Sequence, residues 1–185
     1  MVKKYFLLTA GGVDRKGIVF WLTKILKKYG FNIEDSSMIM LRHTFSVIVL
    51  LSIGEAAGGA ALKKFRSEID SFMNKSGMSA GIREISDGEM KEYREEGRKY
   101  ILSISGADKP GIVNSMTGIL YENGINILDM ETKSSQNTSP AAYYMFLEVD
   151  VPKKVNIGTL GRALRDAGKK IGVHVSINRV ESEVL

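Results

Sequence analysis

Two periods of hydrophobic spacing alternate along the chain, and they do so twice in the same order. Residues 3–10 and 98–105 are short, mostly apolar runs followed closely by glycine, a pattern typical of strands. Residues 16–29 place apolar side chains at helical spacing with lysines opposite, and Gly30 follows where a helix end favours a left-handed residue. A second helical run ends at Gly124 in the same way. Each of these strands is therefore predicted to lead into an amphipathic helix.

The rest of each half completes one fold. Further strands and helices are predicted at residues 31–41, 44–53, 59–75 and 80–86, and their counterparts at 125–135, 141–150, 156–171 and 173–181. Turns are predicted at Arg42 and His43 and, in the second copy, at residues 136–140. The order predicts an α+β fold of two ferredoxin-like βαββαβ domains, each an antiparallel sheet with its helices on one face. In the strand from Phe45 to Leu51 the odd-numbered residues are expected on one face, and Ile48 and Leu50 make the other face apolar as well. We therefore expect the second face of the sheet to be covered by the other copy or by another subunit, and we expect a homodimer.

The two halves are copies of one another. The strand from Tyr5 aligns with the strand from Tyr100, and after one extra residue in the first copy residues 14–35 align without gaps on residues 108–129. In that 22-residue window 11 positions are identical. A period of roughly 95 residues is too long for a solenoid, so the pattern predicts a duplicated domain.

A charged segment separates the copies. Residues 87–99 are mostly charged, with a glycine near each end, which predicts a linker that could contain one helical turn. We place the first domain at residues 1–87, the linker at 88–98 and the second domain at 99–185. Residues 1–86 carry 13 Lys and Arg against 7 Asp and Glu, whereas residues 100–185 carry 9 of each. The basic excess could mark an acidic partner, nucleic acid or simply solvated helix faces.

Composition narrows the class of protein. The 185 residues are 44% hydrophobic and 25% charged, values of a globular rather than a disordered chain. No apolar run reaches the roughly 18 residues that a membrane helix needs. Cysteine is absent, which excludes disulfides, cysteine metal sites and a thiol nucleophile. A cytoplasmic location is the default expectation.

The turn from the first strand into the first helix carries the candidate chemistry of each copy. It reads Gly-Gly-Val-Asp-Arg-Lys-Gly-Ile-Val from Gly11 and Gly-Ala-Asp-Lys-Pro-Gly-Ile-Val from Gly106. Free N–H groups at a helix start favour a carboxylate, and a nearby Asp could hold an ammonium group, so the loop suits a zwitterionic amino acid. The Asp could instead cap the helix, with Pro110 in its first turn, and the segment would then bind nothing.

Asn32 and Asn126 open the second strand of each copy. In a split βαβ unit this strand start can lie near the first loop of a neighbouring domain. An amide offers a donor and an acceptor together, which suits it to orienting an amino acid. Ordinary turn chemistry after a helix end is the alternative explanation.

These motifs resemble those of tandem ACT domains. The resemblance is carried by the Asp-x-Pro-Gly-Ile-Val turn at residues 108–113, the Gly-x-Asn-Ile steps and the duplicated βαββαβ units. The first half, mainly residues 9–19, 32–41 and 45–52, is more narrowly similar to the glycine cleavage system transcriptional repressors. The resemblance implies a sensor whose ligand, usually an amino acid, binds between two ACT domains, against the first loop and the start of the second strand.

Carried over to this chain, the resemblance implies eight ligand-binding residues. They are Asp14, Gly17, Ile18, Asn32, Asp108, Gly111, Ile112 and Asn126. It also implies action on a partner, such as a DNA-binding regulator, without a DNA-binding motif in this chain. Lys16 stands where the family turn usually has Pro, and one residue fewer precedes Pro110, so the second copy is favoured as the intact motif.

Enzymatic and nucleic-acid functions are less well supported. His43 and His174 are not in metal-ligand or catalytic-triad spacing, and no phosphate-binding glycine motif occurs. Tyr144 and Phe146 are expected on one face of their strand and Tyr143 on the other, where core packing and domain pairing explain them better than base stacking. We expect no catalysis, cofactor or metal, and no direct contact with nucleic acid or membrane.

The predicted function is therefore a non-enzymatic regulator that senses a small ligand, an amino acid, and acts on a partner such as a transcription regulator. The bound ligand would favour one arrangement of the domains, which the partner reads. Two alternatives stay open: a constitutive protein-interaction module, and a separate regulatory subunit of an amino-acid metabolic enzyme.

Overall fold

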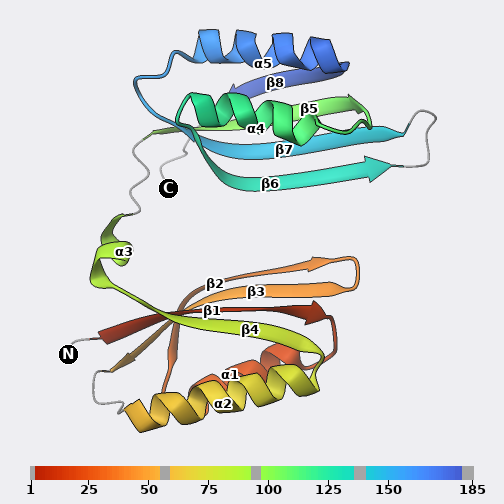
Figure 1. Ribbon diagram of the computed structural model, residues 1–185. Helices are drawn as coiled ribbons and strands as arrows, with labels where there is room; N and C mark the ends of the chain where they lie inside the picture. Colours follow the sequence, from red (N-terminus) through yellow and green to blue (C-terminus); the bar gives the residue numbers. More distant parts are fainter. Residues whose placement is uncertain (1–2, 55–58, 93–96, 136–140, 181–185) are drawn as a thin grey trace. The chain divides into compact units, whose positions relative to one another are not determined.

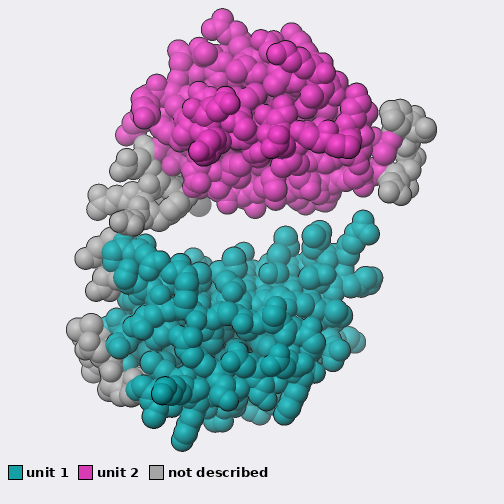
Figure 2. Space-filling model, viewed as in Figure 1, with its two compact units in different colours: residues 1–93 teal, residues 94–185 magenta. Residues whose placement is uncertain are grey.

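The computed structural model describes residues 3–54, 59–92, 97–135 and 141–180. The chain divides into two compact units, residues 1–93 and 94–185, which are coloured separately in Figure 2. Within the described residues, no helix combines the length and the apolar character needed to cross a membrane.

The first unit contains a four-stranded antiparallel sheet in the order β2-β3-β1-β4. Figure 1 shows α1 and α2 on the same face of this sheet. Its elements in chain order are β1 (Lys3–Val13), α1 (Ile18–Lys28), β2 (Asn32–Leu41), β3 (Thr44–Gly54), α2 (Gly59–Lys75), β4 (Met78–Ile85) and a short helix α3 (Asp87–Glu92).

The second unit repeats this topology with the strand order β6-β7-β5-β8 and with both helices on one face (Figure 1). Its elements are β5 (Arg98–Ala107), α4 (Ile112–Glu122), β6 (Asn126–Ser135), β7 (Ala142–Val151), α5 (Ile157–Ile171) and β8 (Val173–Arg179). The predicted α+β fold of two ferredoxin-like βαββαβ domains is confirmed. The predicted turn at residues 136–140 lies outside the described residues.

Strand pairing shows how the two copies correspond. Gly12 pairs with the first residue of β4, and Gly106 pairs with the first residue of β8. Phe6 and Tyr100 are both buried in their cores, whereas Tyr5 lies on the opposite face of its strand. The alignment of Tyr5 with Tyr100, with an extra residue in the first copy, is therefore wrong. Equivalent positions are 94 residues apart from Phe6 to Asp35, and the two first loops have the same length.

Each unit has its own hydrophobic core between the sheet and its helices. The first core is rich in aromatic side chains: the ring of Phe31 lies 5.7 Å from that of Phe6 and 4.3 Å from that of Phe65, centroid to centroid. The second core is mainly aliphatic, with Leu102 and Leu147 completely buried. The pattern predicted from Phe45 to Leu51 is confirmed, because its odd-numbered residues are buried.

The face of each sheet that lies away from its helices carries exposed apolar side chains. Ile48 is exposed on β3, and Tyr144 and Phe146 are exposed on β7 while Tyr143 is buried, as the alternation predicted. Every residue of β2 is exposed as well. Coverage of these faces by the other copy or by another subunit stays a prediction.

Candidate functional site

The turns that precede α1 and α4 have the same backbone geometry. Gly17 caps α1 with φ 92° and ψ −1°, and Gly111 caps α4 with φ 93° and ψ −4°. The N–H groups of Asp14 and Asp108 donate to backbone carbonyls just before β3 and β7, at 2.9 and 2.8 Å. A positive φ of this kind is strained for a residue with a Cβ atom, which explains glycine at both helix starts. The two copies therefore keep one loop conformation.

Neither aspartate caps its helix. Among the described residues no side chain accepts a hydrogen bond from the N-terminal N–H groups of α1 or α4, so the helix-cap alternative for the aspartates is wrong. The Asp108 carboxylate instead accepts a hydrogen bond from the Ser134 hydroxyl at 2.6 Å. The Asp14 side chain is exposed and has no bonded partner among the described residues. Pro110 lies in the turn ahead of α4, not in its first helical turn.

The isoleucines that follow the capping glycines point into the cores. Ile18 and Ile112 are both buried, and each belongs to the hydrophobic cluster of its unit. Only their backbone N–H groups remain to contact a ligand at the loop. The loop therefore offers unpaired helix N–H groups next to one carboxylate, a combination that can receive a carboxylate and an ammonium group.

Strand pairing separates the two asparagines from these loops. Asn32 is opposite Ser52 on β3, whereas Val13, just before Asp14, is opposite Thr44. These partners are eight positions apart on β3, which corresponds to about 26 Å along a strand. Asn126 is separated from its loop in the same way. A single unit therefore brings Asp14, Gly17 and Ile18 together but holds its asparagine at the other end of the sheet.

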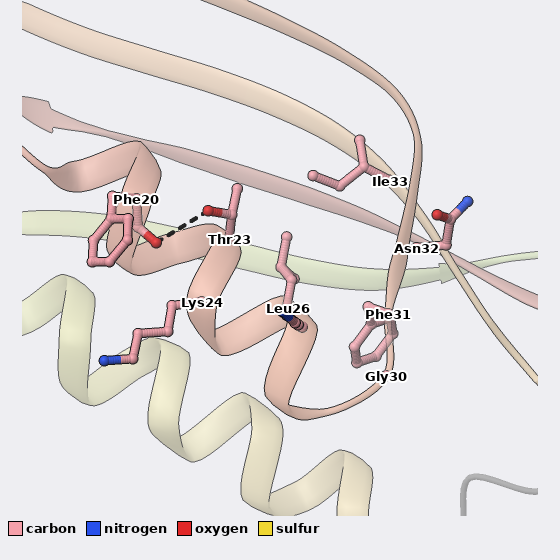
Figure 3. A pocket seen from close by; sticks show the side chains of 9 residues that line it. Phe20, Thr23, Lys24, Leu26, Gly30, Phe31, Asn32 and Ile33 are labelled. Atoms are coloured by element: carbon pink, nitrogen blue, oxygen red, sulfur yellow. Dashed lines mark hydrogen bonds between the residues drawn. The ribbon is translucent and has the colours of Figure 1, made fainter.

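A groove lies between α1 and the start of β2, beside Asn32 (Figure 3). It encloses about 800 Å³ and is lined by Phe20, Thr23, Lys24, Leu26, Lys27, Gly30, Phe31, Asn32 and Ile33. The equivalent groove between α4 and β6 encloses about 470 Å³ and includes Thr117 and Asn126. Nothing in the spacing of motifs indicates this groove, although threonine at the same helix position in both copies is a signal that could have found it.

The groove threonines are already engaged with their own helices. Thr23 donates its hydroxyl hydrogen to the backbone carbonyl of Val19 at 2.9 Å, with that of Phe20 at 3.0 Å, and Thr117 donates to Val113 at 2.9 Å. Their oxygens can therefore only accept a bond from a ligand.

Asn32 belongs to a polar network at the start of β2. Its amide donates to the Glu34 carboxylate at 3.2 Å, which also accepts hydrogen bonds from Lys3 at 2.8 Å and from the Ser52 hydroxyl. These bonds, led by that from Lys3, lower the pKa of Glu34 to about 2. The second copy has Leu128 in place of Glu34, and the Asn126 side chain has no bonded partner within the described part of the chain. The Asn126 amide is therefore free to bond a ligand, whereas the Asn32 amide already donates to Glu34.

The described residues do not form a metal-binding site of three or more side-chain ligands. No group of three or more His, Asp or Glu side chains there is placed to hold an ion. His43 lies in the turn between β2 and β3, and His174 lies on β8 of the other unit.

Comparison with protein families assigns both units. Residues 4–82 match one ACT domain model and residues 100–166 match another. The chain is a tandem ACT-domain protein. The resemblance to ACT domains and to the glycine cleavage system transcriptional repressors is confirmed.

Relatives of this tandem ACT-domain protein cover it to different extents. A UPF0237 protein of Pyrobaculum aerophilum is 33% identical over 82 residues, which are 44% of this chain and 87% of that protein. The glycine cleavage system transcriptional repressor of Escherichia coli is 24% identical over 179 residues, 95% of this chain and 90% of the repressor. A crystal structure of an unknown protein from Galdieria sulphuraria has a TM-score of 0.80 and 27% identity, covering 97% of this chain and all of that one.

Proposed function

We propose that this protein is a non-enzymatic cytoplasmic regulator that binds an amino acid through its ACT domains and acts, as a homodimer, on a partner such as a transcription regulator. The observation that carries the proposal is the loop shared by both units. Each has a glycine at the N-cap position with nearly the same φ and ψ, and in each the first N–H groups of the helix receive no side-chain hydrogen bond. The likeness over 95% of the chain to a protein named as a transcriptional repressor supports a regulatory role.

The loop supplies recognition of both charged groups of an amino acid. The uncapped N–H groups of α1 or α4 receive the carboxylate, assisted by the positive end of the helix dipole. Asp14 or Asp108 receives the ammonium group. The backbone N–H groups of Gly17, Ile18, Gly111 and Ile112 complete the set.

The asparagines act on a ligand that is held by a different ACT domain. Each asparagine is about 26 Å along the sheet from the loop of its own unit. A ligand that contacts a loop and an asparagine together therefore needs these two parts from different domains. Asn126 is the better candidate, since the amide of Asn32 is already bonded to Glu34. A ligand that bridges two domains binds one arrangement of them more tightly than another, and this difference is what a partner can read.

A thermal-shift screen against the twenty amino acids tests the proposal. Ligand at 100 times its dissociation constant adds about 2.7 kcal/mol of stability, and a chain of this length should then melt roughly 5–10 °C higher. We expect one or two selective responses. Asp108→Ala and Asn126→Ala should abolish the response, and Asn32→Ala should weaken it less. The matched control is Asn178→Ala, which changes an exposed asparagine on β8.

Two results would contradict the proposal. No response to any amino acid would favour the constitutive interaction module. A response that survives both Asp108→Ala and Asn126→Ala, alone and with the Asp14 and Asn32 changes, would place the ligand away from these residues.

A further inference from the structure

The solvent-facing side of α1 carries aromatic and basic side chains together. Phe20 is 62% exposed and Trp21 48% exposed, and their rings meet edge to face with centroids 5.4 Å apart. The Lys24 ammonium lies over both rings, 4.5 Å from the centroid of Trp21 and 6.0 Å from that of Phe20, in reach of cation–π attraction. Lys27 follows one turn further along. We call Phe20, Trp21, Lys24 and Lys27 the α1 ridge.

The α1 ridge stands between two hollows. Phe20, Lys24 and Lys27 line the groove of about 800 Å³ between α1 and β2, and Figure 3 shows Phe20 and Lys24 projecting from the same side of the helix. Trp21 and Lys24 line a second groove, of about 560 Å³, between α1 and α2. Each hollow has room for a large side chain of another protein.

The charge of the ridge is not neutralised locally. Within the described ranges neither Lys24 nor Lys27 has an acidic partner. The neighbouring Lys28 does, because the Glu68 carboxylate lies 2.7 Å from its ammonium and also accepts a bond from Tyr29 at 2.8 Å. The ridge therefore adds two uncompensated positive charges to exposed aromatic surface.

The duplicated unit shows that the fold does not require this ridge. Helix α4 has the same length as α1 and the same glycine at its start, and it buries the counterparts of Ile18, Leu22 and Leu26. At the ridge positions it carries Asn114, Ser115, Gly118 and Tyr121. Among the described residues of these two helices, exposed aromatic side chains beside lysines that have no acidic partner are found on α1 and not on α4, and they mark a surface for interaction.

We propose that the α1 ridge docks an acidic segment of the partner protein that carries at least one aromatic or large aliphatic side chain. This rests on the proposed function, in which the protein acts through a partner. Carboxylates of the segment pair with Lys24 and Lys27, and its apolar side chain enters a groove beside Phe20 or Trp21. Such a site combines electrostatic attraction with a buried anchor, the usual composition of a protein contact.

Two other occupants fit the ridge less well. A second copy related by a twofold axis would place the lysines of both ridges in one interface, which is repulsive because the ridge itself carries no carboxylate. A nucleic acid would need open ring faces on which to stack its bases, and one face of Trp21 is already covered by Lys24.

The test uses a fluorescein-labelled synthetic peptide of Glu and Asp interrupted by one Phe and one Leu, titrated with the full chain and followed by anisotropy. Trp21 is the only tryptophan, so its emission gives a second readout in the unlabelled wild-type titration. We expect saturable binding that weakens about tenfold or more between low and high salt. Phe20→Asn with Trp21→Ser, and separately Lys24→Gln with Lys27→Gln, should each weaken binding about tenfold or more. A peptide with Gly in place of Phe and Leu should bind more weakly.

The matched control is Lys63→Gln with Lys64→Gln, which removes two exposed charges of the same unit from α2. Equal weakening by this control would overturn the proposal, because only the overall charge would then matter. So would the absence of peptide binding, tighter binding of a single-stranded oligonucleotide, or a dimer in sedimentation that is lost in the ridge variants. Asp108→Ala and Asn126→Ala change the second unit, so they should abolish the thermal response to the amino acid and leave peptide binding unchanged. Failure of the docking site and failure of the ligand site are therefore separable.

Discussion

Two adjacent glycines of β1 should respond oppositely to the same substitution. A Cβ atom at Gly12 would lie 2.8 Å from the carbonyl oxygen of Gly77 and 2.8 Å from both Cα and Cγ of Met78. A Cβ atom at Gly11 would meet nothing nearer than 3.6 Å, the carbonyl oxygen of Phe45, which is ordinary van der Waals contact. Gly12→Ala therefore forces backbone atoms apart, while Gly11→Ala makes only ordinary van der Waals contacts.

The magnitude follows from the space available. An ordinary contact of 3.4 Å requires the start of β4 to move by about 0.6 Å, and the obstructing atoms are backbone in the tight turn at Gly77, whose φ is 70°. Overpacking of this kind costs about 1–3 kcal/mol, or roughly 5–20 °C in the melting temperature of a unit of this size. Gly11→Ala should be neutral or stabilise by up to about 1 kcal/mol, because alanine has less conformational entropy to lose.

Urea unfolding followed by Trp21 fluorescence measures the effect in the first unit, which contains the only tryptophan. The equivalent Gly106→Ala should destabilise the second unit in the same way, since a Cβ there would lie 2.9 Å from the Gly172 carbonyl oxygen. A loss of stability for Gly11→Ala with none for Gly12→Ala would refute the pairing of β1 with β4. It would restore the correspondence between Gly11 and Gly106 that the sequence alone indicates.

Three further predictions concern single interactions. Hydrogen bonds led by that from Lys3 lower the pKa of Glu34 to about 2 from an ordinary 4.5. The contribution of this carboxylate to stability is therefore present above pH 4.5 and is lost as the pH falls toward 2. NMR titration should find the carboxyl still ionised at pH 3, and Ser52→Ala should raise its pKa. Asn156→Ala removes the side-chain cap that accepts the Thr159 N–H at 3.0 Å, and chemical denaturation should show a loss of about 0.5–2 kcal/mol, against almost none for a change to serine. Gly111→Ala forces a residue with a Cβ atom to adopt φ 93°, so we expect a loss of about 1–2 kcal/mol in the same assay, and an unchanged midpoint would contradict the backbone geometry of this loop.

The spacing of hydrophobic residues was sufficient to predict helices and strands that are buried on one face only. The predicted helix at 59–75 coincides with α2, because Phe65, Ile69 and Met73 recur once per turn and are all buried. The predicted turn at Arg42 and His43 is present, with Arg42 at φ 56°. These features depend on neighbours in the sequence, so local patterns were enough.

The start of each copy was harder to predict because identity and burial disagree there. Tyr5 and Tyr100 match by residue type, yet they lie on opposite faces of their strands, and a shift of one residue exchanges the two faces of a strand. Gly11 and Gly12 suggest that the strand ends at residue 10, whereas β1 continues to Val13 and pairs throughout with β3. Only the pairing of distant strands shows that Gly12, not Gly11, is where β4 approaches closely.

The candidate site shows the same limit. The sequence located both loops and both asparagines, and it correctly indicated that Asp108 and Gly111 lie in one turn. It contains no local sign that Asn126 is at the far end of the sheet, since that distance is set by the register of β6, β7 and β5. The same holds for Glu34, whose partner Ser52 is distant in sequence but adjacent across the sheet.

Comparison of the two copies argues that they have taken on different tasks. A gene duplication first produces two identical surfaces, and a feature needed by both copies for folding or binding should be kept in both. The loop conformation is kept in both. Among the described residues the α1 ridge and the Glu34 network belong to the first unit, and Asn126, whose side chain has no bonded partner there, belongs to the second. If the loop holds the ligand, the second unit supplies the asparagine that is free to contact it, and the first unit supplies the charged aromatic surface that a partner can recognise. Variants of Asn126 and of the α1 ridge should then impair ligand response and partner binding separately, which two units with the same task would not allow.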